Sequence, residues 1–212
     1  MNNYPVKIHK SDRNAPKMLG YKYRFYPTKT QEQFLAQSFG CVRVVYNQTL
    51  AWRKQEFMAN GTKVNQKMMS KFLTNVKTNQ KFNWLNNVSS VALQQSLRHL
   101  HDAYVRFFKK QNEEPTFKKR KNHQSMTLAS NAFKFENNQL SIAKCEQPLN
   151  IRWTRPLSGN VQSITISKDC ANRYFVSFCS KNVEVKSIPV AKNYAIGIDL
   201  GLTDFLITSD GE

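Results

Sequence analysis

Residues 19–40, LGYKYRFYPTKTQEQFLAQSFG, decide the fold because they change from a strand pattern to a helix pattern within a few positions. The odd positions from 19 to 25 are Leu, Tyr, Tyr and Phe, an alternation typical of a half-buried strand over residues 19–27. Pro27 ends that strand, and Thr28 followed three residues later by Gln31 is a capping box that begins a helix. The chain therefore combines strands with helices.

Helical periodicity continues downstream of this start. Helices are predicted over residues 28–40, 42–58 and 65–76, followed by a longer one that begins at Ser89 or Ser90. The first two are joined around Gly40 and resemble a helix-turn-helix, although an ordinary helical hairpin has the same pattern. We expect an all-helical recognition domain over residues 28–113.

Residues 114–192 return to an alternation with period two. The segment 133–143, FKFENNQLSIA, predicts two strands joined by a turn at Asn137 and Asn138. Further short strands are predicted within residues 150–153, 161–167, 173–178 and 183–188. This many short strands favour a small β-barrel. The strand at 19–27 is expected to join it, so that the helical domain is an insertion between barrel strands.

Basic side chains dominate the composition. The 212 residues carry 32 Lys and Arg against 14 Asp and Glu, a net charge of +18. All 32 bases but only 10 of the acids precede residue 193, so that part has a net charge of +22. A surface this positive favours a polyanionic partner, most commonly nucleic acid. Residues 1–18 are expected to form a mobile basic leader.

Several classes of protein are disfavoured by patterns that the sequence lacks. No run approaches the roughly 20 apolar residues of a membrane span. The polar start is not a signal peptide, so we expect a cytoplasmic, nucleoid-associated protein with no membrane partner and no small-molecule substrate. The four cysteines form no CxxC pair, which predicts free thiols rather than a zinc site or a disulfide framework.

The segment 194–212, YAIGIDLGLTDFLITSDGE, holds the candidate catalytic residue. A short apolar strand ends at Asp199, Gly201 turns the chain, and a second strand is predicted at 205–208. A carboxylate at such a strand end can hold a divalent cation against a phosphate. The same Asp-x-Gly pattern also occurs in ordinary turns, where the aspartate only caps the turn.

Several blocks in order along the chain resemble the TnpB-like (OrfB) RNA-guided DNA endonucleases of bacterial insertion sequences, relatives of type V CRISPR effectors. Residues 23–51 resemble the N-terminal start of that family, and residues 84–109 are similar to its recognition helix. The segments 115–128, 151–157 and 164–178 resemble its wedge-barrel segments, and GIDLGLTDF at 197–205 resembles the start of its nuclease domain.

The resemblance implies an α+β chain: a wedge-type β-barrel over 114–192, the inserted helical domain, and the first β-hairpin of an RNase H-like (RuvC) domain at 193–212. It implies guide RNA and DNA as partners and Asp199 as the first of three carboxylates that hold Mg²⁺. The other two carboxylates and a zinc ribbon lie beyond the equivalent of Glu212 in the family. Asp204, Asp210 and Glu212 are expected to be solvated turn acids. We therefore expect an incomplete site that neither holds a functional metal nor cleaves DNA.

Basic residues near the wedge-like segments are the candidates for phosphate contacts, because basic side chains position nucleic acid through its backbone. They are Lys22, Arg24, Arg43, Lys118, Lys119, Arg120, Lys121, Arg152 and Arg155. Tyr21, Phe117 and Trp153 are candidates to stack on bases, although packing in the core is an alternative role for each.

Two other functions fit parts of the sequence. A freestanding transcriptional regulator would read duplex DNA with Arg43, Asn47 and Gln48 of a helix-turn-helix. GIDLGLT also resembles the phosphate-binding start of actin-like ATPases and sugar kinases, but Leu202 stands where that motif has its first hydroxyl residue. Structured RNA that co-purifies with the protein would favour the nuclease-family interpretation, whereas RNA-free binding to a specific duplex would favour the regulator.

Overall fold

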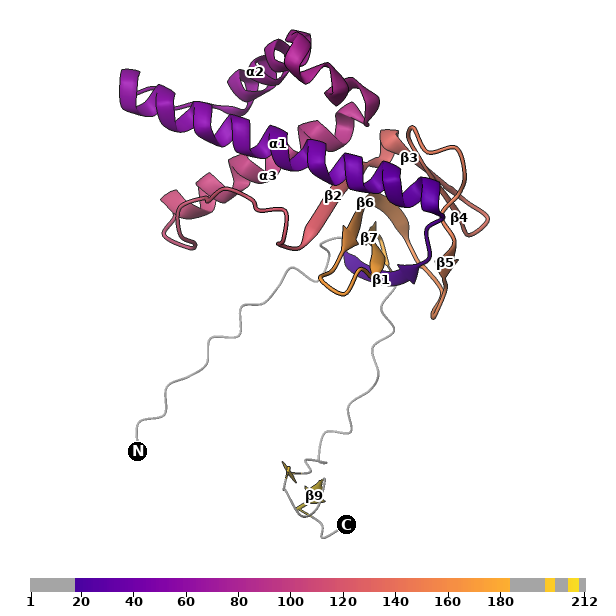
Figure 1. The fold of residues 1–212 in the computed structure, drawn as a ribbon. Coiled ribbons are helices and arrows are strands. Elements are labelled where there is room, and N and C mark those ends of the chain that lie inside the picture. Colours follow the sequence, from indigo (N-terminus) through magenta and orange to yellow (C-terminus); the bar gives the residue numbers. More distant parts are fainter. Residues whose placement is uncertain (1–17, 184–196, 201–205, 210–212) are drawn as a thin grey trace, which may run out of the picture.

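The structure is a computed structural model that describes residues 18–183, 197–200 and 206–209. The helices are α1 (Lys29–Asn60), α2 (Gln66–Thr78) and α3 (Ser90–Phe108), with the 3₁₀ helices η1 (Gln80–Asn87) and η2 (Ser130–Ala132) (Figure 1). The strands are β1 (Leu19–Phe25), β2 (Gln124–Ala129), β3 (Phe133–Glu136), β4 (Gln139–Ile142), β5 (Ile151–Arg152), β6 (Asn160–Lys168), β7 (Tyr174–Lys181), β8 (Ile198–Asp199) and β9 (Ile207–Thr208). Residues 1–17 of the expected leader, and all but the first residue of the strand expected at 183–188, lie outside the described residues.

Helix α1 begins at the predicted capping box. The backbone N–H of Gln31 donates to Oγ1 of Thr28 (3.3 Å), and the N–H of Thr28 donates to Oε1 of Gln31 (3.1 Å). The predicted break at Gly40 is wrong, because α1 continues without interruption to Gly61, whose φ of 63° ends it. Buried side chains flank Gly40 on both sides and form one stripe along the helix. Their packing outweighs the roughly 1 kcal/mol that an interior glycine costs a helix.

The two later helices were predicted correctly. Asn65 caps α2, since its Oδ1 accepts a hydrogen bond from the N–H of Met68 (3.0 Å). Ser89 precedes α3, but its side chain makes no capping hydrogen bond. α3 packs against α1, and the buried hydroxyl of Ser96 donates to the carbonyl of Val42 (3.0 Å).

Five antiparallel strands form one sheet in the order β2-β6-β7-β1-β5, and β3 pairs with β4 in a separate hairpin. The turn at Asn137 and Asn138 is as predicted, with φ of 50° and 60°, typical of a type I′ hairpin. β1 lies in the same sheet as strands that follow the helices, so the helical unit is an insertion, as expected. Among the described strands, however, the sheet is open, with β2 and β5 at its edges, and does not close into the expected barrel.

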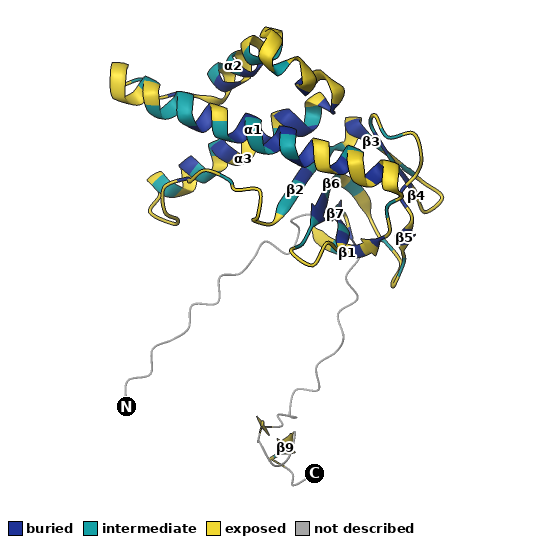
Figure 2. Cartoon of the chain, viewed as in Figure 1, coloured by how far each residue is buried: buried dark blue, intermediate teal, exposed yellow. Residues whose placement is uncertain are grey.

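The core lies between the helices and one face of this sheet. Tyr23 and Phe25 point into it from β1 and are each 1% exposed, which confirms the predicted alternation. The hairpin β3–β4 covers part of the same face by side-chain packing, with the ring of Phe135 5.4 Å from that of Phe178. Figure 2 shows buried positions where α1 and α3 meet each other and the sheet. None of the described helices is long and apolar enough to cross a membrane.

Candidate nucleic-acid interface

The opposite face of the sheet carries the predicted basic residues of β1 and β5. Because Tyr23 and Phe25 point inward, Lys22 and Arg24 point outward and are exposed. Arg24 lies directly opposite the exposed Arg152 on the neighbouring strand. Like charges in such a cross-strand pair destabilise a sheet. An anion bound between them would remove this penalty.

An aromatic ring lies among these cations. Phe175 of β7 pairs in register with Arg24, and its half-buried ring lies 4.4 Å from Nζ of Lys22. Arg173, which was not among the predicted residues, places its guanidinium 6.0 Å from the same ring and forms an ion pair with Asp169 (2.7 Å). The alternation in RYFVSF was the available signal, since it puts Arg173 and Phe175 on one face.

Hydroxyl side chains extend this face across the sheet. Thr127, Thr165 and Ser177 follow one another across β2, β6 and β7, in the row that ends at Lys22. The hydroxyls of Thr127 and Thr165 lie 3.0 Å apart and share a hydrogen bond. Serine and threonine hydroxyls bind phosphate oxygens and sugars in nucleic-acid complexes. We call this surface the basic sheet face: Lys22, Arg24, Thr127, Arg152, Thr165, Phe175 and Ser177.

Arg155 and its neighbours in the sequence line an open pocket. The guanidinium of Arg155 lies 5.2 Å from the ring of Tyr21, and the hydroxyl of Tyr23 donates to the carbonyl of Arg155 (3.3 Å). Trp153 is half-buried and packs edge-on against Tyr23, with ring centroids 4.8 Å apart. It also lines the pocket beside Arg155 and Asn138. Trp153 thus belongs to the core and keeps a surface available to a ligand.

The run of basic residues at 118–121 divides into two parts. Lys118 is half-buried, its Nζ lies 4.2 Å from the ring of Tyr46, and burial lowers the pKa of this lysine. Its backbone is held by Asn47 of α1, whose Nδ2 donates to the Lys118 carbonyl (3.0 Å) and whose Oδ1 accepts from the Lys118 N–H (2.9 Å). We name residues 118–123 the basic loop. Its anchor is Lys118, which faces the protein.

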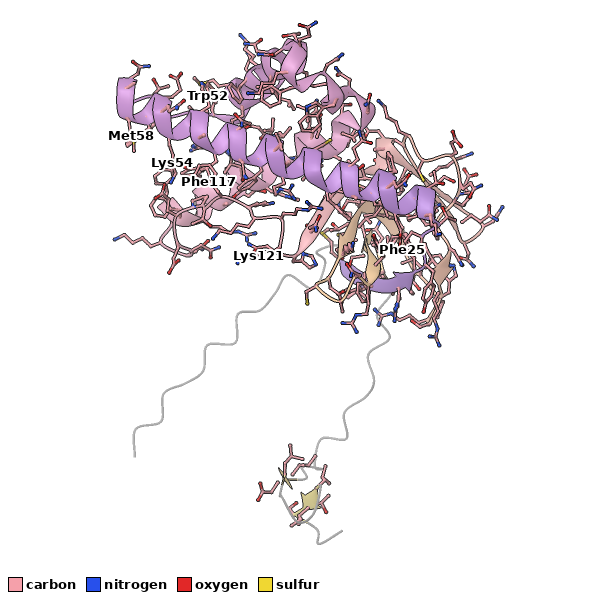
Figure 3. All side chains as sticks on the ribbon, viewed as in Figure 1. Phe25, Trp52, Lys54, Met58, Phe117 and Lys121 are labelled. Atoms are coloured by element: carbon pink, nitrogen blue, oxygen red, sulfur yellow. The ribbon has the colours of Figure 1, made fainter. Side chains whose placement is uncertain are left out.

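The other basic side chains of the loop are exposed. Lys119, Arg120 and Lys121 face solvent, and Figure 3 shows Lys121 at the edge of the fold between helices and sheet. Arg43 of α1 is half-buried and lines a small pocket together with Lys119 and His123. The structure therefore brings Arg43 to the basic loop. Phe117, just before the loop, is 49% exposed.

A transcriptional regulator was expected to read duplex DNA with Arg43, Asn47 and Gln48, but these residues do not lie on a separate recognition helix. The side-chain amide of Asn47 is occupied by the backbone of Lys118, and α1 has no turn within it. Gln48 is exposed. Of the three proposed base-reading residues, Asn47 is thus already used within the fold.

Asp199 lies on the C-terminal hairpin, which was predicted as a strand pair. It is exposed and pairs in register with Ile207, so β8 and β9 form as expected. The N–H of Gly197 donates to Oγ of Ser209 (3.0 Å) and holds the ends together. The other acids named above, Asp204, Asp210 and Glu212, lie outside the described residues.

The described residues do not themselves fit a two-metal site. Asp199 is the one carboxylate within segments 197–200 and 206–209, whereas two cations need several converging acids. In the part of the chain that the structure describes, no three His, Cys, Asp or Glu side chains gather into a metal-binding group. Cys41, Cys145, Cys170 and Cys179 are free thiols in the structure.

Comparisons with known proteins agree on one family. A family model described as a helix-turn-helix domain, of the OrfB type from IS605 elements, matches residues 18–62. A "Putative RNA-guided DNA endonuclease" of Streptomyces pristinaespiralis is 40% identical over 195 residues, covering 91% of this chain and 48% of the relative. A protein of the same description from Escherichia coli K12 is 27% identical over 196 residues, with 92% and 48% covered. The chain thus spans about half the length of these relatives.

A solved structure, the Cas12f1–sgRNA–target DNA complex, shows a weaker similarity. Its protein chain is 11% identical with a TM-score of 0.45, covering 91% of this chain and 54% of that one. A TM-score below 0.5 does not establish a shared fold. The assignment of this chain to a family therefore rests on the two sequence relatives and the family model.

Proposed function

Because this chain belongs to the TnpB-like (OrfB) family, we propose that residues 18–183 form the nucleic-acid-binding part of an RNA-guided DNA endonuclease and hold guide RNA and target DNA. One observation carries the proposal: Arg24 and Arg152 lie opposite each other on adjacent strands, beside Phe175. Two exposed guanidinium groups in register form a ready site for a phosphate, because each can donate two hydrogen bonds to it. Within the described residues, no acid lies in register with either arginine.

The remaining groups of the basic sheet face suit RNA. The row of hydroxyls that leads away from Lys22 can bind phosphate oxygens and the 2′-hydroxyl, which distinguishes RNA from DNA. Phe175 offers a ring on which a base can stack once the flanking cations turn to the phosphates. This surface is therefore assigned to the guide RNA.

The basic loop supplies a second set of contacts. Lys119, Arg120 and Lys121 are exposed together, while the anchor at Lys118 fixes where they point. Arg43 adds a fourth cation from α1.

The proposal divides the chain into three domains. Residues 28–113 act as the recognition domain, residues 114–192 as the wedge domain, and residues 193–212 as the beginning of the nuclease domain.

We do not propose that residues 1–212 alone cleave DNA. Asp199 would supply one ligand to the Mg²⁺ that the family resemblance implies. The other acids after residue 193 all fall within 13 positions of it in the sequence. A Mg²⁺- or Mn²⁺-dependent cleavage assay with a guide RNA, comparing the wild type with Asp199→Ala, tests this. Cleavage by the wild type that the substitution abolishes would show a complete site.

The salt dependence of RNA binding tests the proposed interface. Counterion release gives a log–log slope of about −0.7 per phosphate neutralised on a single strand. Arg24→Ala and Arg152→Ala together remove the contact to the one phosphate that the two guanidiniums share, so the slope should become less steep by about 0.7 and binding to all sequences should weaken alike. Lys67→Ala and Lys71→Ala, which remove two exposed charges from α2, form the matched control. Wild-type binding that is insensitive to salt would refute the proposal.

A further inference from the structure

A groove lies at the C-terminal ends of α1 and α3, at the end of the helical unit that projects away from the sheet (Figure 1). It encloses about 520 Å³, and its lining is mainly apolar. Phe57, Met58 and Phe108 are 60%, 83% and 68% exposed there, and Figure 3 places Met58 near the tip of α1. Contiguous exposed apolar side chains of this size mark binding surfaces.

Four aromatic side chains, together with Met58 and Val64, make up the apolar lining. The rings of Tyr104 and Phe108 are stacked with centroids 6.0 Å apart, and Phe107 lies 5.3 Å from Phe108. The guanidinium of Arg53 lies over Tyr104 at 3.8 Å from its centroid. Aromatic rings combined with a guanidinium plane are the surfaces on which unpaired nucleobases stack.

Arg53, which lines the groove, has one guanidinium nitrogen that is not hydrogen-bonded to any described residue. Nη1 of Arg53 is buried and has no hydrogen-bond partner among the residues that the structure describes. A buried donor without a partner costs about 1–3 kcal/mol, which an acceptor from a ligand would recover. The nearby carboxylate of Glu114 is already paired with Lys54 (2.9 Å), while Lys63 is exposed at the rim. Because Arg53 lines the groove, an anionic ligand bound there can supply this acceptor once the guanidinium turns toward it.

We propose that this groove binds an unpaired nucleobase of single-stranded nucleic acid, with an adjacent phosphate accepting from Arg53 and Lys63. The inference rests on the proposed nucleic-acid-binding function and adds a site that is separate from the basic sheet face and the basic loop. Stacking supplies the binding energy here, since the groove offers few polar groups to read the edges of a base.

Fluorescein-labelled ten-nucleotide oligouridine and oligoadenosine, titrated into wild type and variants, provide the test. Phe57→Ala and Phe108→Ala should each weaken binding about 5- to 150-fold, the range for loss of one stacked base. The salt slope should stay at the wild-type value, because stacking releases no counterions. Trp84→Ala, which removes an aromatic side chain of η1 that does not line the groove, should bind within twofold of wild type. Thermal melting establishes that each variant is folded.

Crosslinking locates the contact directly. Oligonucleotides containing 4-thiouridine should crosslink to the peptides that carry Phe57, Tyr104 or Phe108. If wild type binds with a steep salt slope while the groove variants bind within twofold of it, this inference is wrong and the proposed function stands. Failure of wild type to bind either oligonucleotide contradicts both. Groove variants that change the sedimentation coefficient and not RNA affinity would assign the groove to a protein contact and overturn the proposal.

Discussion

Replacing Asn47 with alanine removes the two hydrogen bonds that hold Lys118, the anchor of the basic loop. In the structure, the Asn47 side chain acts as an additional peptide group that pairs with both backbone groups of Lys118, 71 residues away in the sequence. The donor–acceptor distances of 3.0 and 2.9 Å are those of well-formed hydrogen bonds. Asn47→Ala breaks both bonds at once and leaves the charge of the chain unchanged.

The size of the effect follows from these two bonds. Each contributes about 0.5–1.5 kcal/mol net, so their loss should lower the free energy of unfolding by about 1–3 kcal/mol. Both bonds are only partly buried, so water can hydrogen-bond to the backbone of Lys118 in the variant. The decrease in the free energy of unfolding should therefore fall in the lower half of that range. For a chain of this length, a loss of 1 kcal/mol lowers Tm by about 2–4 °C.

Urea unfolding followed by tryptophan fluorescence measures the change, and hydrogen exchange locates it. Amides of the basic loop should exchange faster in Asn47→Ala than in wild type, while those of β6 and β7 keep their protection. Gln48→Ala, at the exposed neighbouring position of α1, is the matched control. If Asn47→Ala unfolds within 0.5 kcal/mol of wild type, or if Gln48→Ala is equally destabilised, the reasoning about the anchor is wrong.

Two further predictions concern the fold itself. Gly159→Ala should lower the free energy of unfolding by at least about 1 kcal/mol, because φ is +78° and a Cβ there would lie 2.5 Å from the carbonyl of Lys181. Gly20→Ala, with nothing within 4 Å of its Cβ, is the control, and equal urea midpoints for the two variants would contradict the prediction. Cys41 should react with a disulfide reagent at pH 8 far more slowly than the exposed Cys170. Burial raises the pKa of Cys41 to about 11, which leaves about 0.1% thiolate at that pH, and equal labelling rates would disagree.

The sequence by itself determined the local elements. The alternation from 19 to 25, the capping box at Thr28 and the Asn137–Asn138 turn each depend on residues a few positions apart, and each occurs where it was predicted. The charge distribution likewise favoured nucleic acid without any structure. Such signals are readable because hydrogen bonds and side-chain alternation within one element involve near neighbours only.

The tertiary structure decided which of these residues act together. Gly40 is a break by its local preference, but the buried stripe of α1 against α3 keeps the helix continuous. In the sequence, Lys118 and Lys119 are equivalent candidates for a phosphate contact. In the structure, Asn47 binds the backbone of Lys118, and the side chain of Lys118 lies over the ring of Tyr46. The register of β1 with β5 places Arg24 beside Arg152, across 128 positions of sequence. These outcomes depend on packing and strand register between distant segments, which no local pattern of residues encodes.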